Sequence, residues 1–191
     1  MISGDSLAIL ALWVPLLVAL IAAAGAYLNA TLLERRKAAL AQINEQLEKL
    51  YGPLFALSRA SEETWLRFRQ HNRPDMPFFD AHSPPTEAEL EMWRRWLSKV
   101  FIPLNERMAK VIVEHMHLLE GSTMPSSFLT LIANVEAFRV IKSRWAEGDL
   151  SEHAPTFNFP ADFRPDVEAA FHRLRARQAA LIGATQARAA D

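Results

Sequence analysis

An uncharged apolar run near the start of the chain constrains its fold more than any other feature. No charged side chain occurs from Leu7 to Leu28. At about 1.5 Å per residue, a helix of this length spans the roughly 30 Å hydrocarbon core of a bilayer. A cleaved signal peptide would carry its basic residues before a shorter apolar core, whereas here they come after it. The sequence therefore predicts a transmembrane helix over residues 7–30, preceded by a short extracytoplasmic N-terminus of residues 1–6.

The basic residues that follow this run predict its orientation. Arg35, Arg36 and Lys37 form a membrane-proximal cluster a few residues after the last apolar turn. Cytoplasmic flanks of transmembrane helices are enriched in lysine and arginine. We therefore expect a single-pass protein of the cell inner membrane, with its N-terminus outside and its C-terminal domain in the cytoplasm. The lipid bilayer is its first expected partner.

Composition narrows the chemistry of the remaining chain. The absence of cysteine excludes a disulfide framework, zinc–thiolate and iron–sulfur sites, and cysteine nucleophiles. Lysine and arginine number 21 against 22 acidic residues, so no basic field favours nucleic acid. The six glycines form no phosphate-binding loop, and no strand-like alternation is present. Helix is the one element that the pattern supports well.

Leucines spaced by seven predict that the membrane helix continues into the cytoplasm. The pattern consists of Leu33, Leu40, Leu47 and Leu54, with Ile43, Leu50 and Leu57 at the intermediate positions. Such a pattern forms a seam between packed helices. The flanking positions lack the complementary charges of a free zipper, which favours packing inside a helical bundle over a two-chain coiled coil.

Gly52 and Pro53 interrupt this leucine pattern. We expect a kink or a brief break there, with Pro53 opening a second helix that runs to about Gln70. Two interpretations remain open. Pro53 either occupies the first turn of a new helix, or the bend sets the angle between membrane helix and bundle and so decides which face meets a partner. Because alanine is the better helix former, replacing both residues by alanine is expected to preserve folding.

The remaining sequence predicts further amphipathic helices. Thr86 and Glu89 form a capping box that opens a helix bent at Pro103 and ended at Gly121. Its inward positions repeat every seven residues, with a second set between the later ones: Leu90, Leu97, Leu104, Val111 and Leu118, then Phe101, Met108 and His115. Later helices are expected from residues 124 to 148 and from 165 to about 183, with loops at residues 71–85 and 149–164. The predicted fold is all-α: one transmembrane helix continuing into a cytoplasmic four- or five-helix bundle over residues 31–183, with a disordered tail at residues 184–191.

Few residues suggest chemistry. Glu114 and His117 have the Glu-x-x-His spacing that di-iron helical bundles use for metal ligands. A complete site needs a second such pair, and the nearest one, Glu168 and His172, is spaced one residue too far apart. No Gly-x-Ser-x-Gly elbow or serine–lysine motif occurs. We therefore expect no bound metal, no cofactor and no enzymatic activity.

Tryptophans and arginines are candidate contact residues. Trp93 and Trp96 together cover more than the inward face of their helix. Either the loop of residues 71–85 folds over one of them, or one ring is an exposed contact for a protein partner. Arg173, Arg175 and Arg177 form a basic strip on the last helix, which is either a solvated face or a contact with anionic lipid.

Three segments resemble known sequences. They are Leu47–Leu54 (LEKLYGPL), Pro103–Met108 (PLNERM) and Asn158–Pro160 (NFP). They resemble uncharacterised bacterial membrane-anchored helical proteins with an LYGPL segment, over most of residues 33–183. The resemblance implies a membrane-anchored helical architecture and implies no activity or catalytic residue.

These observations favour a non-enzymatic function. We expect a membrane-tethered helical interaction or scaffold module at the cytoplasmic face, which recruits a protein partner or oligomerises with one. Ala22, Ala26 and Ala30, spaced by four, would also permit self-association through the transmembrane helix. Two alternatives remain: a bundle metal or redox enzyme, and a membrane-active regulatory effector whose membrane helices assemble and alter permeability.

Overall fold

The computed structural model describes residues 4–155 and 158–189, with the side chains of residues 13, 15–155 and 158–183. Within these ranges the secondary structure is all helical, as the sequence predicts. The elements in chain order are α1 (Gly4–Glu45), the π-helical turn η1 (Gln46–Tyr51), α2 (Gly52–Asn72), α3 (Glu87–Trp96), the π-helical turn η2 (Leu97–Phe101), α4 (Ile102–Glu114), the 3-10 turn η3 (Met116–Leu118), α5 (Ser126–Ala146) and α6 (Phe163–Ala189).

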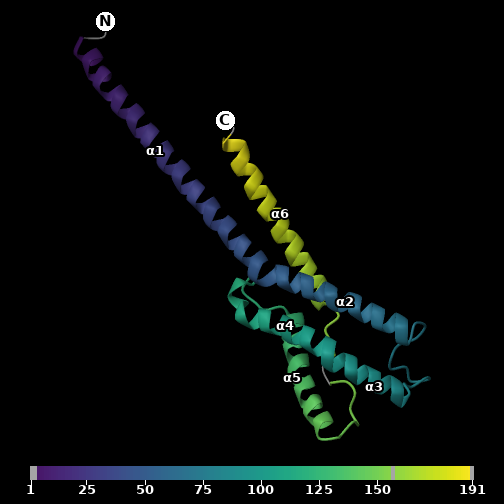
Figure 1. Cartoon of the computed structure of the whole chain (residues 1–191). Helices are drawn as coiled ribbons and strands as arrows, with labels where there is room; N and C mark the ends of the chain where they lie inside the picture. Colours follow the sequence, from purple (N-terminus) through teal and green to yellow (C-terminus); the bar gives the residue numbers. More distant parts are fainter. Residues whose placement is uncertain (1–3, 156–157, 190–191) are drawn as a thin grey trace.

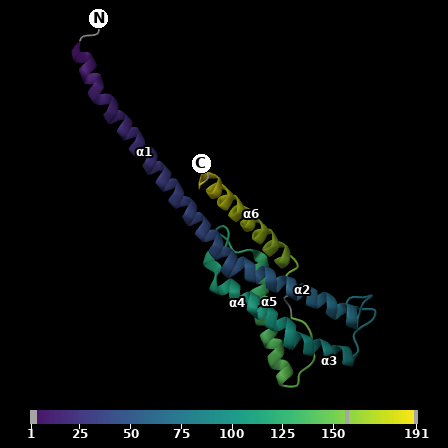
Figure 2. The ribbon, with the colours of Figure 1, turned by 45° about the horizontal axis from the view of Figure 1, so that its top comes forward.

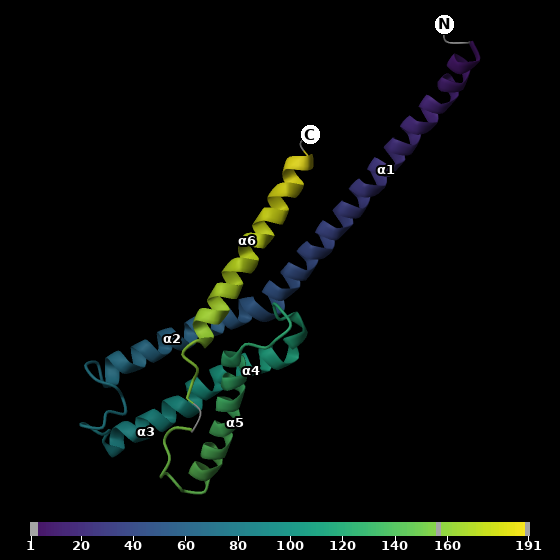
Figure 3. The ribbon, with the colours of Figure 1, turned by 180° about the vertical axis from the view of Figure 1, so that it is seen from behind.

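The helices pack around the lower end of α1 (Figure 1). The N-terminal half of α1 stands away from every other element, whereas its last turns enter the packed region. The α3–η2–α4 segment runs back beside α2, and α5 packs against α4 (Figures 1 and 3). Helix α6 returns alongside the lower half of α1, towards the N-terminal end of the molecule (Figure 3). It contacts α1, η1 and α2.

Residues 4–72 form one helical path that bends at η1 (Figure 2). The N–H of Gly52 donates to the carbonyl of Leu47, five residues earlier, which is the hydrogen bond of a π turn. Pro53 lies in the first turn of α2, and the π turn before it accommodates the missing N–H of the proline. The expected bend is therefore present, but it arises without a break, and α2 ends at Asn72 rather than near Gln70.

The second π turn changes which residues face the core. The sequence pattern predicts Leu104, Met108 and Val111 as inward positions; Met108 is buried, whereas Leu104 and Val111 are half-buried. The buried positions of α4 also include Ile102, Asn105, Ala109 and Ile112, which the pattern does not contain. A π turn inserts one extra residue, so every later side chain rotates about the helix axis relative to the seven-residue pattern. The helix also ends earlier than expected, at Glu114 instead of Gly121.

The apolar side chains form two core clusters. The cluster near the end of α1 contains Ile43, Leu47, Leu50, Tyr51, Leu54, Met108, Ile112, Leu118, Phe128, Leu131, Phe163, Val167, Ala170 and Leu174. The cluster farther along α2 is mainly aromatic and contains Phe68, Phe78, Trp93, Leu97, Phe101, Ile102, Phe138 and Ile141. Because the first cluster takes residues from α1 and η1, the end of the long helix belongs to the packed domain.

The end of the chain differs from its prediction. Helix α6 begins at Phe163 and continues to Ala189. Residues 184–189, expected as a disordered tail, are therefore helical, while residues 190–191 lie outside the described residues.

Candidate interaction site

The first half of α1 presents an apolar surface that no other element covers. Every described side chain from Pro15 to Ala30 is exposed, and Leu20 and Tyr27 are each 70% exposed. Exposure of so much apolar surface to water is unfavourable. By length and composition, this helix is long and apolar enough to cross a membrane.

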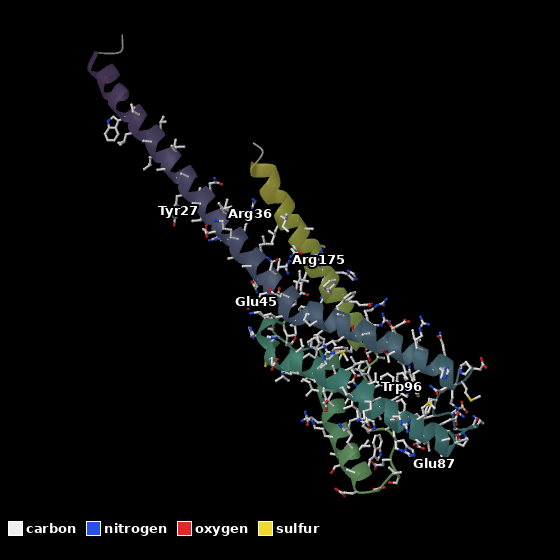
Figure 4. All side chains as sticks on the ribbon, in the orientation of Figure 1. Tyr27, Arg36, Glu45, Glu87, Trp96 and Arg175 are labelled. Atoms are coloured by element: carbon white, nitrogen blue, oxygen red, sulfur yellow. The ribbon has the colours of Figure 1, made fainter. Side chains whose placement is uncertain are left out.

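The membrane-proximal basic residues follow this apolar surface. Lys37 pairs with Glu34 at 2.9 Å, and both side chains are exposed. Arg35 is exposed and Arg36 is half-buried, and neither forms an ion pair with any residue that the structure describes. Figure 4 labels both Tyr27 and Arg36 on α1. Two arginines here therefore lack an acidic partner among the described residues.

The junction at Gly52 and Pro53 is tightly packed. A Cβ atom on Gly52 would collide with the carbonyl oxygen of Leu47, across the π turn. Next to it, Tyr51 is 3% exposed, and its hydroxyl oxygen accepts a hydrogen bond from the N–H of Glu120 at 3.0 Å. Burial raises the pKa of Tyr51. The junction is thus fixed to the loop after α4, and Gly52 is required by close backbone approach.

A groove lies between the α1–η1 segment and α6. It has a volume of about 570 Å³, opens to solvent, and is lined by Asn44, Leu47, Glu48, Phe171, Arg175 and Gln178. The side-chain amide of Gln178 donates to Asn44 Oδ1 at 2.6 Å. We call this surface the α1–α6 groove. The sequence analysis did not identify it, because Asn44 and Gln178 are 134 residues apart and neither belongs to a local motif.

The charges of the α1–α6 groove are not paired with each other. Within the described chain, the Glu48 carboxylate forms no ion pair, and Arg175 donates to Gln178 Oε1 at 2.5 Å. The neighbouring arginines differ, since Arg173 and Arg177 both approach Glu120, at 3.0 and 3.5 Å. The basic strip expected on the last helix is therefore divided, with Arg175 alone on the side of the groove. Figure 4 marks Arg175 on α6.

The two candidate tryptophans lie within the aromatic cluster. Trp93 is 8% exposed, and the rings of Phe78 and Phe79 lie 5.4 and 5.5 Å from it. Its indole N–H donates to the carbonyl of His153 at 2.9 Å. Trp96 is half-buried against Phe68. The loop after α2 thus folds over Trp93, and the buried ring offers little surface to a partner.

Glu114 and His117 do not form the pair that their spacing suggests. Helix α4 ends at Glu114, and His117 lies in η3, so the two residues do not share one helix. Both are exposed, and Glu114 lies 3.7 Å from Lys110. Among the described residues, no group of three or more histidines and carboxylates is placed to hold a metal ion.

Comparison with known proteins identifies no relative. The chain matches no family model, no curated protein and no solved structure.

Proposed function

We propose that this chain is a single-pass inner-membrane protein whose helical domain, a bundle at the cytoplasmic face, binds a protein partner there. One observation carries the proposal: the uncovered apolar half of α1 continues without a helical break into the packed domain. Insertion into a bilayer removes this apolar surface from water. The continuous helix would then hold the domain at a defined position relative to the membrane.

The membrane-proximal cluster supports the proposed orientation. Arg35, Arg36 and Lys37 follow the apolar surface, and the positive-inside rule assigns such a flank to the cytoplasm. A reporter fused after Asp191 tests this directly. We expect activity from a reporter that functions only in the cytoplasm. Activity from a reporter that requires the periplasm would contradict the orientation.

The distribution of polar side chains supports a binding function better than a catalytic one. The buried polar side chains hold the domain together: Gln46 donates to the carbonyl of Leu118, and Asn105 to Asn134, at 3.0 and 3.4 Å. The open α1–α6 groove, by contrast, presents a polar and aromatic surface whose charges are available for external contacts. A module that recruits or oligomerises with a protein fits this distribution.

Co-purification tests the proposed function. Tagged full-length protein is extracted from membranes in a mild detergent, and the proteins that accompany it are identified by mass spectrometry. We expect a stoichiometric partner, either another protein or a second copy, whose recovery falls when Arg175→Glu alters the groove. The control Arg139→Glu changes an exposed arginine on α5 and should leave recovery unchanged. Recovery of no partner, or equal loss in both variants, would count against the proposal.

A further inference from the structure

The α1–α6 groove carries one negative and one positive charge on opposite walls. Glu48 belongs to η1 and Arg175 to α6, and both side chains are exposed. The carboxylate of Glu48 has no ion-pair partner in the described chain, and Arg175 is held only by the amide of Gln178. Unlike Arg173 and Arg177, which share Glu120, these two groups have charge left to offer another molecule.

The charges of Glu48 and Arg175 lie at the same position along the axis of α1. The hydrogen bond between Gln178 and Asn44 fixes the register of the two helices, which run in opposite directions. Glu48 follows Asn44 by four residues, and Arg175 precedes Gln178 by three. At about 1.5 Å per residue, both charges lie roughly 5 Å from this hydrogen bond, in the same direction.

Because Glu48 and Arg175 lie at the same position along the α1 axis, two copies that insert in the same direction can pair these charges with each other. Copies of a single-pass protein insert in the same direction, so a two-fold axis that relates them must run along the membrane normal. Such an axis brings together residues of equal height. We propose that the α1–α6 groove, which is open to solvent, packs face to face against the same surface of a second copy. Glu48 of each copy then pairs with Arg175 of the other. The inference deepens the proposed function and rests on its membrane insertion.

Apolar residues on the same two helix faces support this occupant. Ile182 lies one turn beyond Gln178 on α6, and Leu33 lies three turns before Asn44 on α1. Each is 40% exposed in the single chain. Packing of two grooves places α1 and α6 of both copies in a four-helix arrangement with antiparallel neighbours, which would cover these side chains. The groove floor contributes the half-buried ring of Phe171.

Mixing two charge-reversed variants tests the contact between copies. Full-length protein is co-expressed with two different tags, extracted in mild detergent, and captured through both tags in sequence. Glu48→Arg alone places arginine opposite Arg175 of the other copy, and Arg175→Glu alone places glutamate opposite Glu48. Because each pair of identical variants contains two like-charge contacts, we expect double capture to fall about tenfold or more. Co-expression of Glu48→Arg with Arg175→Glu restores opposite charges at both contacts and should restore capture.

Matched controls make each outcome informative. Glu136 and Arg139 form an exposed pair on α5, away from the groove, and Glu136→Arg mixed with Arg139→Glu should give wild-type capture throughout. Reduced capture without rescue in the mixture would show that the two charges act within one chain, and would overturn the inference. Capture insensitive to both reversals would also overturn it. Monomeric wild-type protein in the membrane fraction would overturn this inference alone, whereas soluble wild-type protein would overturn the proposed function.

Discussion

At the scale of single residues, Arg73 holds the loop after α2 in place. It is 8% exposed, and its guanidinium donates to the carbonyls of Phe78 and Ser83 at 2.8 and 2.9 Å. The same group pairs with Glu89 at 3.0 Å and lies over the ring of Phe78. One buried side chain therefore connects the end of α2, the loop and the start of α3.

Replacement of Arg73 should destabilise the fold. In Arg73→Met, the carbonyls of Phe78 and Ser83 lose their donor, and each unsatisfied buried group costs about 1–3 kcal/mol. We expect the free energy of unfolding to fall by about 2–4 kcal/mol, measured by tryptophan fluorescence during urea denaturation in detergent. The control Arg67→Met removes an exposed ion pair with Glu63 and should change stability by less than about 0.5 kcal/mol. Similar effects of the two variants would contradict the proposed role.

Glu89 should make stability depend on pH. Its carboxylate accepts hydrogen bonds from the N–H and hydroxyl of Thr86, and these bonds, with the nearby Arg73, lower the pKa of Glu89. Because the folded-state pKa is depressed, this stabilisation is present above the unfolded pKa of about 4.3 and is lost as pH falls through the folded value. In Glu89→Gln, which can still accept these bonds, the urea midpoint should vary less between pH 6 and pH 3 (roughly the titration range of glutamate). Parallel pH profiles would contradict this prediction.

At the scale of helical elements, two segments share one sequence pattern and one geometry. Leu47, Lys49, Pro53 and Leu54 recur at the same spacing as Leu97, Lys99, Pro103 and Leu104. In both segments a π turn ends two residues before the proline, and the N–H of the residue between them bonds to the carbonyl five residues back. A proline lacks an N–H and crowds the carbonyl four residues earlier, and the wider π turn accommodates both effects.

The sequence predicted features with a local signal and missed those that depend on the π turns or on tertiary packing. The capping box of Thr86 and Glu89 is confirmed, because its signal is local and both of its hydrogen bonds form. After Pro103 the pattern correctly placed Met108 and Leu118 in the core but missed Asn105, Ala109 and Ile112, because apolar spacing alone cannot distinguish a bent α-helix from one with an inserted residue. Contacts such as Gln178 with Asn44 depend on the tertiary arrangement and leave no local pattern.

The π turn also reverses the expected effect of alanine at the junction. Helix propensity alone predicts that Gly52→Ala stabilises the helix by about 1 kcal/mol. The structure predicts the opposite, because the new Cβ would meet the carbonyl oxygen of Leu47 and force η1 to shift. We expect Gly52→Ala to lower the midpoint of thermal unfolding, measured by circular dichroism. At Gly183 a Cβ atom would have no neighbour within 4 Å, so Gly183→Ala serves as the control and should have a neutral or stabilising effect. Equal effects would show that η1 tolerates a side chain at Gly52.

At the scale of the whole molecule, the structure indicates where the packed domain begins. The first core cluster takes Ile43 from the end of α1 and Leu47, Leu50 and Tyr51 from η1. These residues precede Pro53 and fall within residues 31–183, the range that the sequence predicts for the bundle. The end of α1 is therefore a structural part of the domain rather than a flexible tether.

Two truncated chains test this boundary. Removal of Ile43, Leu47, Leu50 and Tyr51 exposes the apolar surface they cover, at a cost of about 1.5–3 kcal/mol for each buried side chain. The total is comparable to the stability of a typical domain, about 5–15 kcal/mol. A fragment of residues 36–191 should therefore be soluble, strongly helical and cooperative in thermal unfolding by circular dichroism, whereas a fragment of residues 52–191 should show no cooperative transition. Cooperative unfolding of both fragments at similar temperatures would place the start of the domain at Gly52. In that case the bend at η1 would no longer fix the domain relative to α1, and the fold would no longer hold Glu48 level with Arg175.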